Sequence, residues 1–569
     1  MNTKTLRISC AQLSFPVGAI QENKDKIINT LKEAEKVHSD IVLFPELALT
    51  GYPPEDLLLR ESFVGKNFAV MEEIAEFSGK TSGVIGFVDR SLKKQKNDNV
   101  DRDIANAAAI VQNGDVKGIY HKCFLPNYSV FDEARYFDKG TNASTLFWYE
   151  DIAVGINICE DIWIEDGPAE EQVKKGASII LNINASPFDL NKINQRKDKV
   201  KNKAKKLGVP IVYLNMVGGQ DELVFDGGSF VVDKNGEIIY MAPQFEEDFF
   251  TLDVELDVKD IISESNLYLN DKNVELEPLV STQELDKIES MYAALKLGLS
   301  DYVTKNKFNK VLVGLSGGID SALTATIACD ALTPERVIGV AMPSKYNPES
   351  SLDDAKQLAK NLGINMKEIT IEDTVENIRT LVSANIEEQL KSVVDENIQS
   401  RVRGNLLMAL SNQLNAMVVS TGNKSEMAVG YATLYGDLVG GFALLKDVYK
   451  ADVYNLAKYR NSISEVIPQN TIDKEPSAEL SENQFDSDSL PDYDTLDKII
   501  KLYIEEDFSS EKIINSGIDK NVVYDVLEKI DRNEYKRNQV APGVKLTNRA
   551  FGKDRSCLLY TSPSPRDCT

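Results

Sequence analysis

The segment that most restricts the fold is KVLVGLSGGIDSALTATIACDAL, residues 310–332. Its valine and leucine run predicts a strand, Ser316-Gly317-Gly318 a tight turn, and the alanine-rich remainder a helix. Further apolar segments, RVIGVAMPS, NMKEITI and AMVVSTGN, predict strands that alternate with helical stretches downstream. This alternation favours a doubly wound parallel sheet, which binds ligands at the carboxyl ends of its strands. The second half of the chain is therefore predicted to be an α/β ligand-binding domain.

One helix of this half shows signals for both of its ends. Ser351 and Asp354 have the spacing of a capping box, and Gly363 stands where a helix commonly stops. We predict a helix between these signals.

The glycine-rich turn has the chemistry of a phosphate site. Two adjacent glycines allow several backbone N–H groups to point at one spot, at the positive end of the following helix. Ser316 and Ser321 add hydroxyl donors, and Asp320 adds the oxygen ligand that a magnesium-bound phosphate needs. A plain strand-to-helix turn is the alternative, because glycine is common at such turns. The serines and the carboxylate favour a pyrophosphate site.

The first half is also α/β. Short strands rich in isoleucine and valine alternate with helices such as NKDKIINTLKEAEKVHS. Asn113-Gly114 and Asn235-Gly236 predict two hairpins. A polar, aperiodic stretch then separates the two halves, which predicts a domain at 1–262, a linker at 263–286 and a second domain at 287–555.

The last fourteen residues differ from the rest. SCLLYTSPSPRDCT, residues 556–569, has no periodicity and resembles a translated sequencing-adaptor tail. We expect residues 556–569 to be non-native and the native sequence after Arg555 to be missing. Cys557 and Cys568 would then have no role.

Charge and hydropathy exclude several classes of protein. A net charge of -25 and a pI near 4.7 argue against a nucleic-acid partner, because a polyanion would be repelled. No apolar run approaches the roughly 20 residues of a membrane span, and the N-terminus lacks the apolar core of a signal peptide. We expect a cytoplasmic homo-oligomer that binds neither nucleic acid nor membrane.

Histidine and cysteine are scarce. The chain has only two histidines, His38 and His121, which leaves almost no material for a Cys-His or Ser-His-Asp site or for a histidine-rich metal site. Its six cysteines are scattered without a C-x-x-C pair, so neither zinc nor a disulfide framework is indicated. Any hydrolytic chemistry must use a different base.

Three reactive residues follow predicted strands of the first half: Glu46, Lys122 and Cys159. A cysteine thiolate can attack an amide carbonyl once a base takes its proton, and Glu46 can be that base. Lys122 can offset the acidic charge and stabilise an oxyanion. Solvated charges at strand ends and a cysteine in the core are the alternatives.

The segments around these residues, FPEL, HKCFLPNY…FDE and NICEDIW, resemble the three catalytic blocks of the nitrilase, or carbon–nitrogen hydrolase, superfamily. The resemblance implies an αββα sandwich and a second catalytic glutamate, Glu133. It also implies glutamine contacts from Tyr128, Ser186 and Lys192, the last two in NASPFDLNK. That segment has DLNK where the family pattern has H-x-G-K, which puts the loop shape in doubt.

The glycine-rich turn resembles the SGG-x-DS pyrophosphate loop of the ATP pyrophosphatases, which adenylate a carboxylate or carbonyl. By this resemblance ATP is bound by eight residues of the loop and one later threonine. They are Gly314, Leu315, Ser316, Gly317, Gly318, Ile319, Asp320, Ser321 and Thr421.

Four further segments resemble the synthetase domain of glutamine-dependent NAD synthetases: VVDENIQSRVRGNLLMALSNQ, STGNKSEMAVGYATLYGDLVGGFALLKDVYK, IPQNTIDKEPSAEL and EYKRNQVAPGVKLT. The resemblance implies deamido-NAD contacts from Asn397, Glu426 and Lys536, and a Mg²⁺ ion held by Asp320 and Glu426. Asp437 would lie close to the reacting carbonyl. Read alone, the segment around Thr421 could be a simple turn.

The resemblance covers about residues 5–555 and implies an enzyme that amidates deamido-NAD with ATP and with ammonia cut from glutamine. Two other interpretations stay open. One is a glutamine-fed adenylating enzyme with another acceptor, such as a nucleotide or a tRNA base. The other is a non-catalytic nucleotide sensor with a decayed amidase, against which the intact motifs argue.

Overall fold

The computed structural model describes residues 2–91, 103–258, 267–482 and 484–555. The chain forms two compact units, the first comprising Met1–Gln220 and Val224–Leu285, the second Asp221–Leu223 and Asp286–Thr569. The predicted tail with Cys557 and Cys568, and residues 263–266 of the predicted linker, lie outside the described residues.

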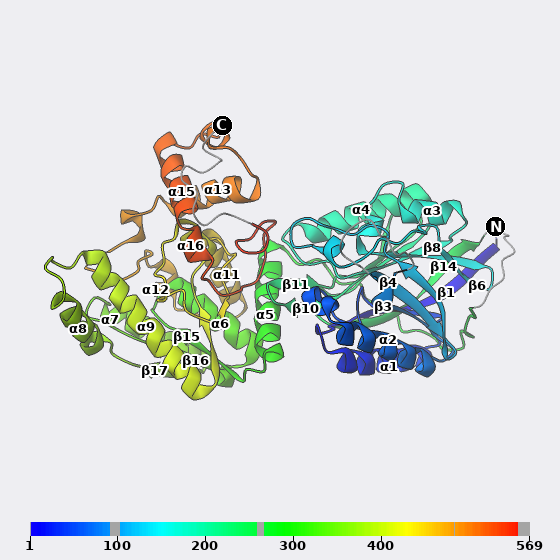
Figure 1. Ribbon diagram of the computed structural model, residues 1–569, viewed down its shortest axis with the longest axis horizontal. Helices are drawn as coiled ribbons and strands as arrows, with labels where there is room; N and C mark the ends of the chain where they lie inside the picture. Colours follow the sequence, from blue (N-terminus) through cyan, green and yellow to red (C-terminus); the bar gives the residue numbers. More distant parts are fainter. Residues whose placement is uncertain (1, 92–102, 259–266, 483, 556–569) are drawn as a thin grey trace. The chain divides into compact units, whose positions relative to one another are not determined.

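The first unit is a sandwich of two six-stranded sheets between two pairs of helices (Figure 1). One sheet has the order β14 (Asp248–Val258), β1 (Asn2–Gln12), β2 (Ile41–Leu43), β3 (Ser82–Arg90), β4 (Ile104–Gln112), β5 (Asp115–His121). The other has the order β13 (Ile238–Met241), β12 (Phe230–Val232), β9 (Ile211–Asn215), β8 (Ile179–Asn184), β7 (Ile152–Ile158), β6 (Leu146–Tyr149). A separate two-stranded ribbon is formed by β10 (Val217–Gln220) and β11 (Leu223–Asp226).

Three apolar layers hold this sandwich together. Helices α1 (Ile20–Lys36) and α2 (Glu61–Phe77) cover the first sheet, whereas α3 (Pro168–Lys174) and α4 (Lys192–Leu207) cover the second. The inward-facing residues of both sheets form the central core, which includes Ile8, Ile156 and Leu181. The predicted αββα arrangement is confirmed. Both Asn-Gly hairpins are also present, as the antiparallel pairs β4–β5 and β12–β13.

Residues 267–285 contain no helix or named strand and belong to the first unit. Leu267 forms a bridge with Tyr149, and the Asn270 backbone N–H donates to Asp40 Oδ1 at 2.7 Å. The described part of the predicted linker is therefore irregular but hydrogen-bonded.

The second unit contains a five-stranded parallel sheet in the order β17 (Asn365–Glu368), β16 (Val337–Ala341), β15 (Lys310–Gly314), β18 (Ala416–Ser420), β19 (Phe442–Ala443). Helices α8 (Glu372–Ser383) and α9 (Ser392–Leu414) pack on one face through a shared apolar cluster. The other main helices are α5 (Lys287–Lys305), α6 (Ile319–Leu332), α7 (Glu349–Leu362), α10 (Lys424–Val429) and α11 (Lys450–Ile463). The predicted doubly wound parallel sheet is confirmed.

The C-terminal part of this unit is helical. It comprises α12 (Gln469–Asp473), α13 (Tyr493–Ile500), a π-helical turn (Lys501–Glu505), α14 (Ser510–Ile514), α15 (Lys520–Arg532) and α16 (Glu534–Arg537). Leu496, Val526 and Ile530 lie in its own apolar core.

The predicted capping box is wrong, although the predicted stop is right. Helix α7 begins at Glu349 after Pro348 and has no side-chain cap. Ser351 instead donates to Glu479 Oε1 at 2.7 Å, and Asp354 accepts a hydrogen bond from Asn470 at 2.6 Å. Gly363 ends the helix with a φ of 70°, in the left-handed region that favours glycine.

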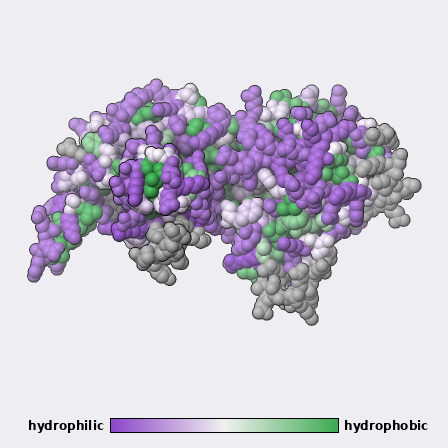
Figure 2. Space-filling model, turned by 90° about the horizontal axis from the view of Figure 1, so that it is seen from above, coloured by the Kyte–Doolittle hydropathy of each residue, from purple (hydrophilic) through white to green (hydrophobic). Residues whose placement is uncertain are grey.

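The face seen in Figure 2 is mostly hydrophilic, with small, scattered hydrophobic areas. Acidic residues outnumber basic ones by 89 to 64, in keeping with that surface. Within the described ranges, no helix is both long and apolar enough to cross a membrane.

Candidate active sites

The first unit brings the predicted glutamate, lysine and cysteine to one buried place. Glu46 follows β2, Lys122 follows β5, and Cys159 follows β7 of the opposing sheet. Lys122 Nζ donates to Glu46 Oε1 at 2.6 Å and to Glu133 Oε1 at 2.8 Å. The Glu46 and Lys122 side chains are fully buried, and Cys159 is 4% exposed. These four residues form what we term the acid–lysine–cysteine cluster.

The Glu46 carboxylate is held from three sides. Its Oε1 atom accepts from Lys122 and, at 2.7 Å, from Asn106 Nδ2. Its Oε2 atom accepts from the Ala185 backbone N–H at 3.0 Å. Oε1 thus accepts two hydrogen bonds and Oε2 only one, so Oε2 keeps the greater free acceptor capacity.

The charges of the cluster interact strongly because water is excluded. Burial by itself would lower the pKa of Lys122, but the Glu133 and Glu46 carboxylates outweigh it and raise that pKa well above its ordinary value. Burial raises the pKa of Glu133 to about 7, against the opposing charge of Lys122. Burial, and next Glu46, raise the pKa of Cys159 well above the ordinary thiol value, with Lys122 opposing. The cysteine is thus a neutral thiol that needs a base.

Cys159 has an unusual backbone conformation. It opens a short 3-10 helix, Cys159–Ile162, with a φ of 44°, which non-glycine residues rarely adopt. Such strained positions are common at functional sites, where the surrounding contacts maintain them.

The three predicted glutamine contacts lie in different surroundings. Tyr128 is half-exposed and its hydroxyl donates to Glu160, the neighbour of Cys159, at 2.9 Å. Lys192 Nζ lies 4.9 Å from the centre of the Trp163 ring, and burial lowers the pKa of this lysine. Ser186 is buried, and its hydroxyl accepts from Arg196 Nε at 3.3 Å.

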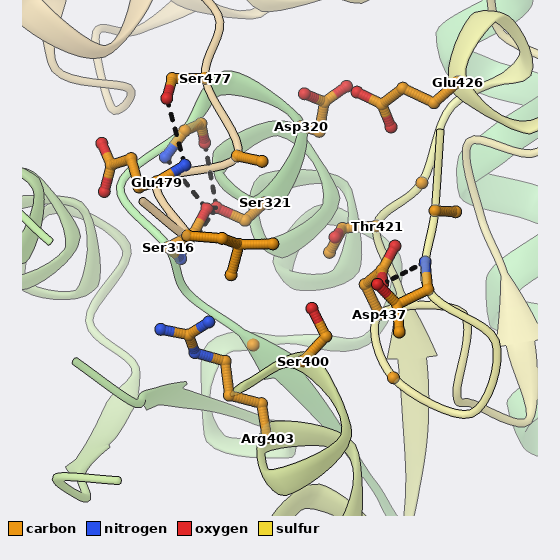
Figure 3. Close-up of a pocket in the computed structure, with 18 of the residues that line it drawn as sticks. Ser316, Asp320, Ser321, Ser400, Arg403, Thr421, Glu426, Asp437, Ser477 and Glu479 are labelled. Carbon is orange, nitrogen blue, oxygen red and sulfur yellow. Dashed lines mark hydrogen bonds between the residues drawn. The ribbon is translucent and has the colours of Figure 1, made fainter. Parts of the chain in front are cut away.

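The second unit contains a pocket of about 460 Å³ at the carboxyl ends of β15, β16 and β18 (Figure 3). The walls include most of the residues predicted to bind ATP or deamido-NAD. They are Gly314, Leu315, Ser316, Gly318, Ile319, Asp320, Ser321, Asn397, Thr421 and Glu426. Gly317 and Lys536 are not among the wall residues in the part of the chain that is described.

The glycine-rich loop is closed by its own hydrogen bonds. The hydroxyls of Ser316 and Ser321 lie 3.2 Å apart, and Ser321 donates to the Gly318 carbonyl at 2.9 Å. Gly317 has a φ of 83°, and a Cβ there would lie 2.3 Å from the Ser351 carbonyl oxygen. Only glycine fits this position, which is why the loop can pass so close to α7.

A lysine lies between the two carboxylates predicted to hold Mg²⁺. The carboxylates of Asp320 and Glu426 point toward each other (Figure 3), and Lys450 Nζ donates to them at 2.6 Å and 3.3 Å. Asn423 caps α10 and donates to Asp320 Oδ1 at 2.8 Å. Burial raises the pKa of Glu426 to about 8, with Lys450 opposing. Among the described residues no group of three metal-ligating side chains forms, so a cation here would need further ligands from a substrate.

Asp437 and Lys536 also lie at or beside this pocket. Thr433 connects Asp437 to the wall residue Asn397, because its hydroxyl donates to Asn397 Oδ1 at 2.8 Å and its N–H to Asp437 Oδ1 at 2.7 Å. Lys536 Nζ donates to the carbonyls of Gly430 and Ala432 at 2.7 Å and 2.9 Å, and both of these residues are in the pocket wall.

Comparisons with known proteins identify the family of each half of the chain. The family described as carbon-nitrogen hydrolase matches residues 7–263, and that described as NAD synthase matches residues 291–540. The glutamine-dependent NAD(+) synthetase of Thermotoga maritima is 45% identical, covering 97% of this chain and 98% of that protein. The Aquifex aeolicus glutamine-dependent NAD(+) synthetase is 44% identical, covering 96% of this chain and 98% of that protein. This chain belongs to the glutamine-dependent NAD(+) synthetase family.

A solved structure of the same family extends this likeness to three dimensions. The glutamine-dependent NAD+ synthetase of Acinetobacter baumannii, solved with ADP, is 40% identical with a TM-score of 0.74, and the match covers 98% of both chains. The resemblance to glutamine-dependent NAD(+) synthetases that the motifs predicted is therefore confirmed along nearly the whole chain.

Motif reading missed several residues that this member of the glutamine-dependent NAD(+) synthetase family places at its sites. Asn106 contacts Glu46, Tyr52 donates to Glu133 at 2.9 Å, and Lys450 joins Asp320 to Glu426. Arg403 is a fourth, with its guanidinium in the pocket wall and its pKa lowered to about 10 by burial. A polar residue inside an apolar strand, such as Asn106 in ANAAAIV, was a usable signal.

Proposed function

We propose that the protein makes NAD from deamido-NAD, with ATP as the activating substrate and glutamine as the source of nitrogen. One observation carries this proposal. A single chain of this family holds both a buried acid–lysine–cysteine cluster and a pocket walled by the SGG-x-DS loop. The products are NAD, AMP, pyrophosphate and glutamate.

The first site would release ammonia from glutamine. Glu46 takes the thiol proton through Oε2, since Oε1 is already shared by Lys122 and Asn106. Cys159 Sγ attacks the side-chain amide carbon, and the Lys122 ammonium stabilises the oxyanion. The C–N bond breaks as Glu46 returns the proton to the leaving nitrogen, which leaves a thioester. Water, deprotonated by Glu46, then releases glutamate and restores the thiol.

Three side chains around Cys159 would bind the glutamine substrate. Lys192 would pair with the carboxylate of glutamine, and Tyr128 and Ser186 would contact its polar groups. Their support is the family pattern together with their placement: Tyr128 contacts Glu160 next to the nucleophile, and Lys192 lies over Trp163. Glu133 accepts a second hydrogen bond from Lys122 and would help to orient it.

The second site would form and then amidate an acyl-adenylate. The loop N–H groups with Ser316 and Ser321 bind the pyrophosphate part of ATP, and Thr421 contacts the nucleotide. The nicotinate carboxylate attacks the α-phosphorus and pyrophosphate leaves. Ammonia then attacks the carbonyl carbon near Asp437, and AMP leaves. Asn397, Glu426 and Lys536 are the proposed deamido-NAD contacts.

The carboxylates of Asp320 and Glu426 are the residues that would hold Mg²⁺. Oxygen ligands suit this ion, which commonly takes one or two carboxylates and completes its shell with phosphate oxygens and water. When bound, Mg²⁺ supplies charge neutralisation of the leaving pyrophosphate. Lys450, which already contacts both carboxylates, is the protein's own positive charge at this place.

We assign the glutaminase to residues 1–262 and the synthetase to residues 287–555, in a cytoplasmic homo-oligomer without nucleic acid or membrane as partner. The test measures NAD formation from deamido-NAD and ATP, with glutamine and with ammonium side by side, together with pyrophosphate release. We expect NAD with either nitrogen source. No NAD and no pyrophosphate with deamido-NAD, but pyrophosphate when another acceptor is supplied, would indicate the other adenylating enzyme. No pyrophosphate with any acceptor would indicate a nucleotide sensor.

A further inference from the structure

Beneath the acid–lysine–cysteine cluster lies a buried carboxylate to which the mechanism assigns no role. Asp161 is fully buried, and its two oxygens divide four hydrogen bonds between them. Oδ1 accepts from the backbone N–H groups of Cys123 at 3.1 Å and Phe124 at 2.9 Å. Oδ2 accepts from the Tyr120 hydroxyl at 2.8 Å and the Ile158 N–H at 3.2 Å.

These partners belong to the two segments that carry the reacting groups. Cys123 and Phe124 directly follow Lys122, whereas Ile158 directly precedes Cys159. Oδ1 therefore binds only the lysine segment, whereas Oδ2 joins Tyr120 of the first sheet to Ile158 at the cysteine turn of the second sheet. Asp161 joins the two sheets at the place where the lysine and the thiol must meet.

The cysteine turn depends on this contact. Cys159 has a positive φ of 44°, a conformation that persists only when its surroundings enforce it. The bond from the Ile158 N–H to Asp161 closes the 3-10 turn around Cys159. A charged acceptor also makes these bonds stronger than neutral ones.

We propose that Asp161 is a positioning residue for amide hydrolysis, which sets the Lys122 ammonium and the Cys159 thiol in register across the two sheets. This inference rests on the proposed glutaminase function of the first unit. It requires both carboxylate oxygens, because an asparagine presents one oxygen and one N–H₂ group. Asp161→Asn could keep either the lysine segment or the cysteine turn, but would place a donor against a donor at the other.

Asp40 provides a matched control in the same unit. It is also fully buried, and each of its oxygens accepts a backbone N–H at 2.7 Å, from Arg7 on Oδ2 and from Asn270 on Oδ1. Lys272 Nζ also lies 3.1 Å from Asp40 Oδ2, and neither Lys272, Arg7 nor Asn270 belongs to the acid–lysine–cysteine cluster. Asp40→Asn therefore removes a similar buried carboxylate, and any effect it has reports on the fold and not on the reacting groups.

The experiment compares the full-length wild type, Asp161→Asn and Asp40→Asn below their melting temperatures. It measures glutamate release, ammonia-driven NAD formation and the rate of Cys159 alkylation by iodoacetamide from pH 6 to pH 10. A displacement of reacting groups by about 1 Å lowers rates about 100-fold, so we expect a loss of that size in the glutamate-release kcat of Asp161→Asn. Its alkylation profile should shift to higher pH, because a displaced Lys122 lowers the thiol pKa less. Ammonia-driven synthesis should be unchanged, and Asp40→Asn should keep wild-type glutamate release and alkylation.

Equal losses of glutamate release in the two variants, or none in Asp161→Asn, would overturn the inference alone. A wild type that forms NAD from ammonium but releases no glutamate would overturn the proposed glutaminase and the inference with it. If Asp161→Asn does not fold, Tyr120→Phe removes one of the four hydrogen bonds and leaves the carboxylate in place. We then expect a fall of about fivefold in the glutamate-release kcat, the size of one net hydrogen bond, with KM unchanged. An unchanged kcat would contradict the proposal.

Discussion

The two sites share a charge pattern but differ in access. In the first unit Lys122 lies between Glu46 and Glu133, and in the second unit Lys450 lies between Asp320 and Glu426. Lys122 and Glu46 are fully buried, so their charges can only be balanced by each other and by the rest of the cluster. Lys450, Asp320 and Glu426 all lie in the wall of a pocket, where an incoming ion or phosphate can change their partners.

This difference in access depends on whether the protein or the substrates supply the reacting groups. In amide hydrolysis the nucleophile and the base are side chains, so the protein must build the whole charge arrangement before the substrate arrives. In adenylation the reacting carboxylate and phosphorus belong to the substrates, so the protein supplies donors around a cavity. The first site is therefore closed and complete, and the second is open and completed by its ligands.

Cys159→Ala should have the largest effect, and it tests whether the two sites work independently. Removing the proposed nucleophile should lower glutamate release at least about 10⁴-fold, as for other covalent catalysts. NAD formation with ammonium should stay within about twofold, since no step of adenylation uses the thiol. Parallel assays with glutamine and with ammonium measure both. Loss of the ammonia-driven reaction would show that the two sites are not independent.

The paired substitutions Lys122→Met and Lys450→Met test directly whether water and ions can reach the charged residues of each site. Lys122→Met leaves buried carboxylates without a counter-charge, which we expect to lower the free energy of unfolding by about 3–5 kcal/mol. Lys450→Met leaves carboxylates beside a pocket, where water and Mg²⁺ can reach them, and should cost about 1–2 kcal/mol.

Thermal unfolding with and without Mg²⁺ distinguishes the two variants. Millimolar Mg²⁺ should raise the Tm of Lys450→Met, because the ion can take the place of the ammonium, and should leave the Tm of Lys122→Met unchanged. The same Mg²⁺ response in both variants would contradict the contrast between a closed and an open site.

Much of this arrangement could be predicted from the sequence because it is local. Strand and helix periodicity, the two Asn-Gly hairpins and the glycine at the end of α7 each depend on a few neighbouring residues. The predicted capping box at Ser351 was wrong because it, too, rested on local spacing alone. Its spacing is common, and the partners that actually engage Ser351 and Asp354 are Glu479 and Asn470, more than a hundred residues away.

The site residues that the sequence did not predict are held by contacts between positions far apart in the chain. Asn106 is 60 residues from Glu46, and Lys450 is 130 residues from Asp320. No short pattern connects such pairs, since the order of strands in a sheet decides which strand ends become neighbours. Motif resemblance identified Glu46, Lys122 and Cys159 as a set, but the residues that hold them in place needed the fold.

Substitution of either of two glycines should damage one site and leave the other intact. A Cβ on Gly86 would lie 2.2 Å from the Pro45 carbonyl oxygen and 2.4 Å from the Leu47 nitrogen, on either side of Glu46. Gly86→Ala must therefore displace Glu46, the proposed base, and we expect about 100-fold slower glutamate release with normal ammonia-driven synthesis.

Gly317→Ala is the counterpart in the second unit. Its Cβ would meet the Ser351 carbonyl at 2.3 Å and force the phosphate loop to move. We expect the KM for ATP to rise about tenfold with either nitrogen source, while glutamate release is normal. Initial rates at varied ATP and glutamine measure these effects. A change in both activities for either variant would weaken the comparison.

The pH dependence of glutamate release should report on Glu133. Burial raises the pKa of this carboxyl to about 7, so it gains a proton as the pH falls through that value and its ion pair with Lys122 is lost. We expect kcat/KM for glutamate release to fall by up to about tenfold per pH unit below 7. Glu133→Gln has no such group and should give a low, flat profile between pH 6.5 and pH 8.5. The same acid limb in that variant would assign it to another residue.

The smallest effect is expected at Lys536. Its ammonium donates to the carbonyls of Gly430 and Ala432 in the pocket wall, so it can act on deamido-NAD by shaping that wall as well as by direct contact. Removing a wall contact costs about 1 kcal/mol, so we expect Lys536→Met to raise the KM for deamido-NAD about threefold to fivefold with kcat unchanged. Lys536→Arg should restore most of the binding, because its guanidinium can donate to both carbonyls. A rise of about 100-fold in Lys536→Met would be too large for a displaced wall, and would instead mean a charge-assisted bond from this ammonium to the dinucleotide.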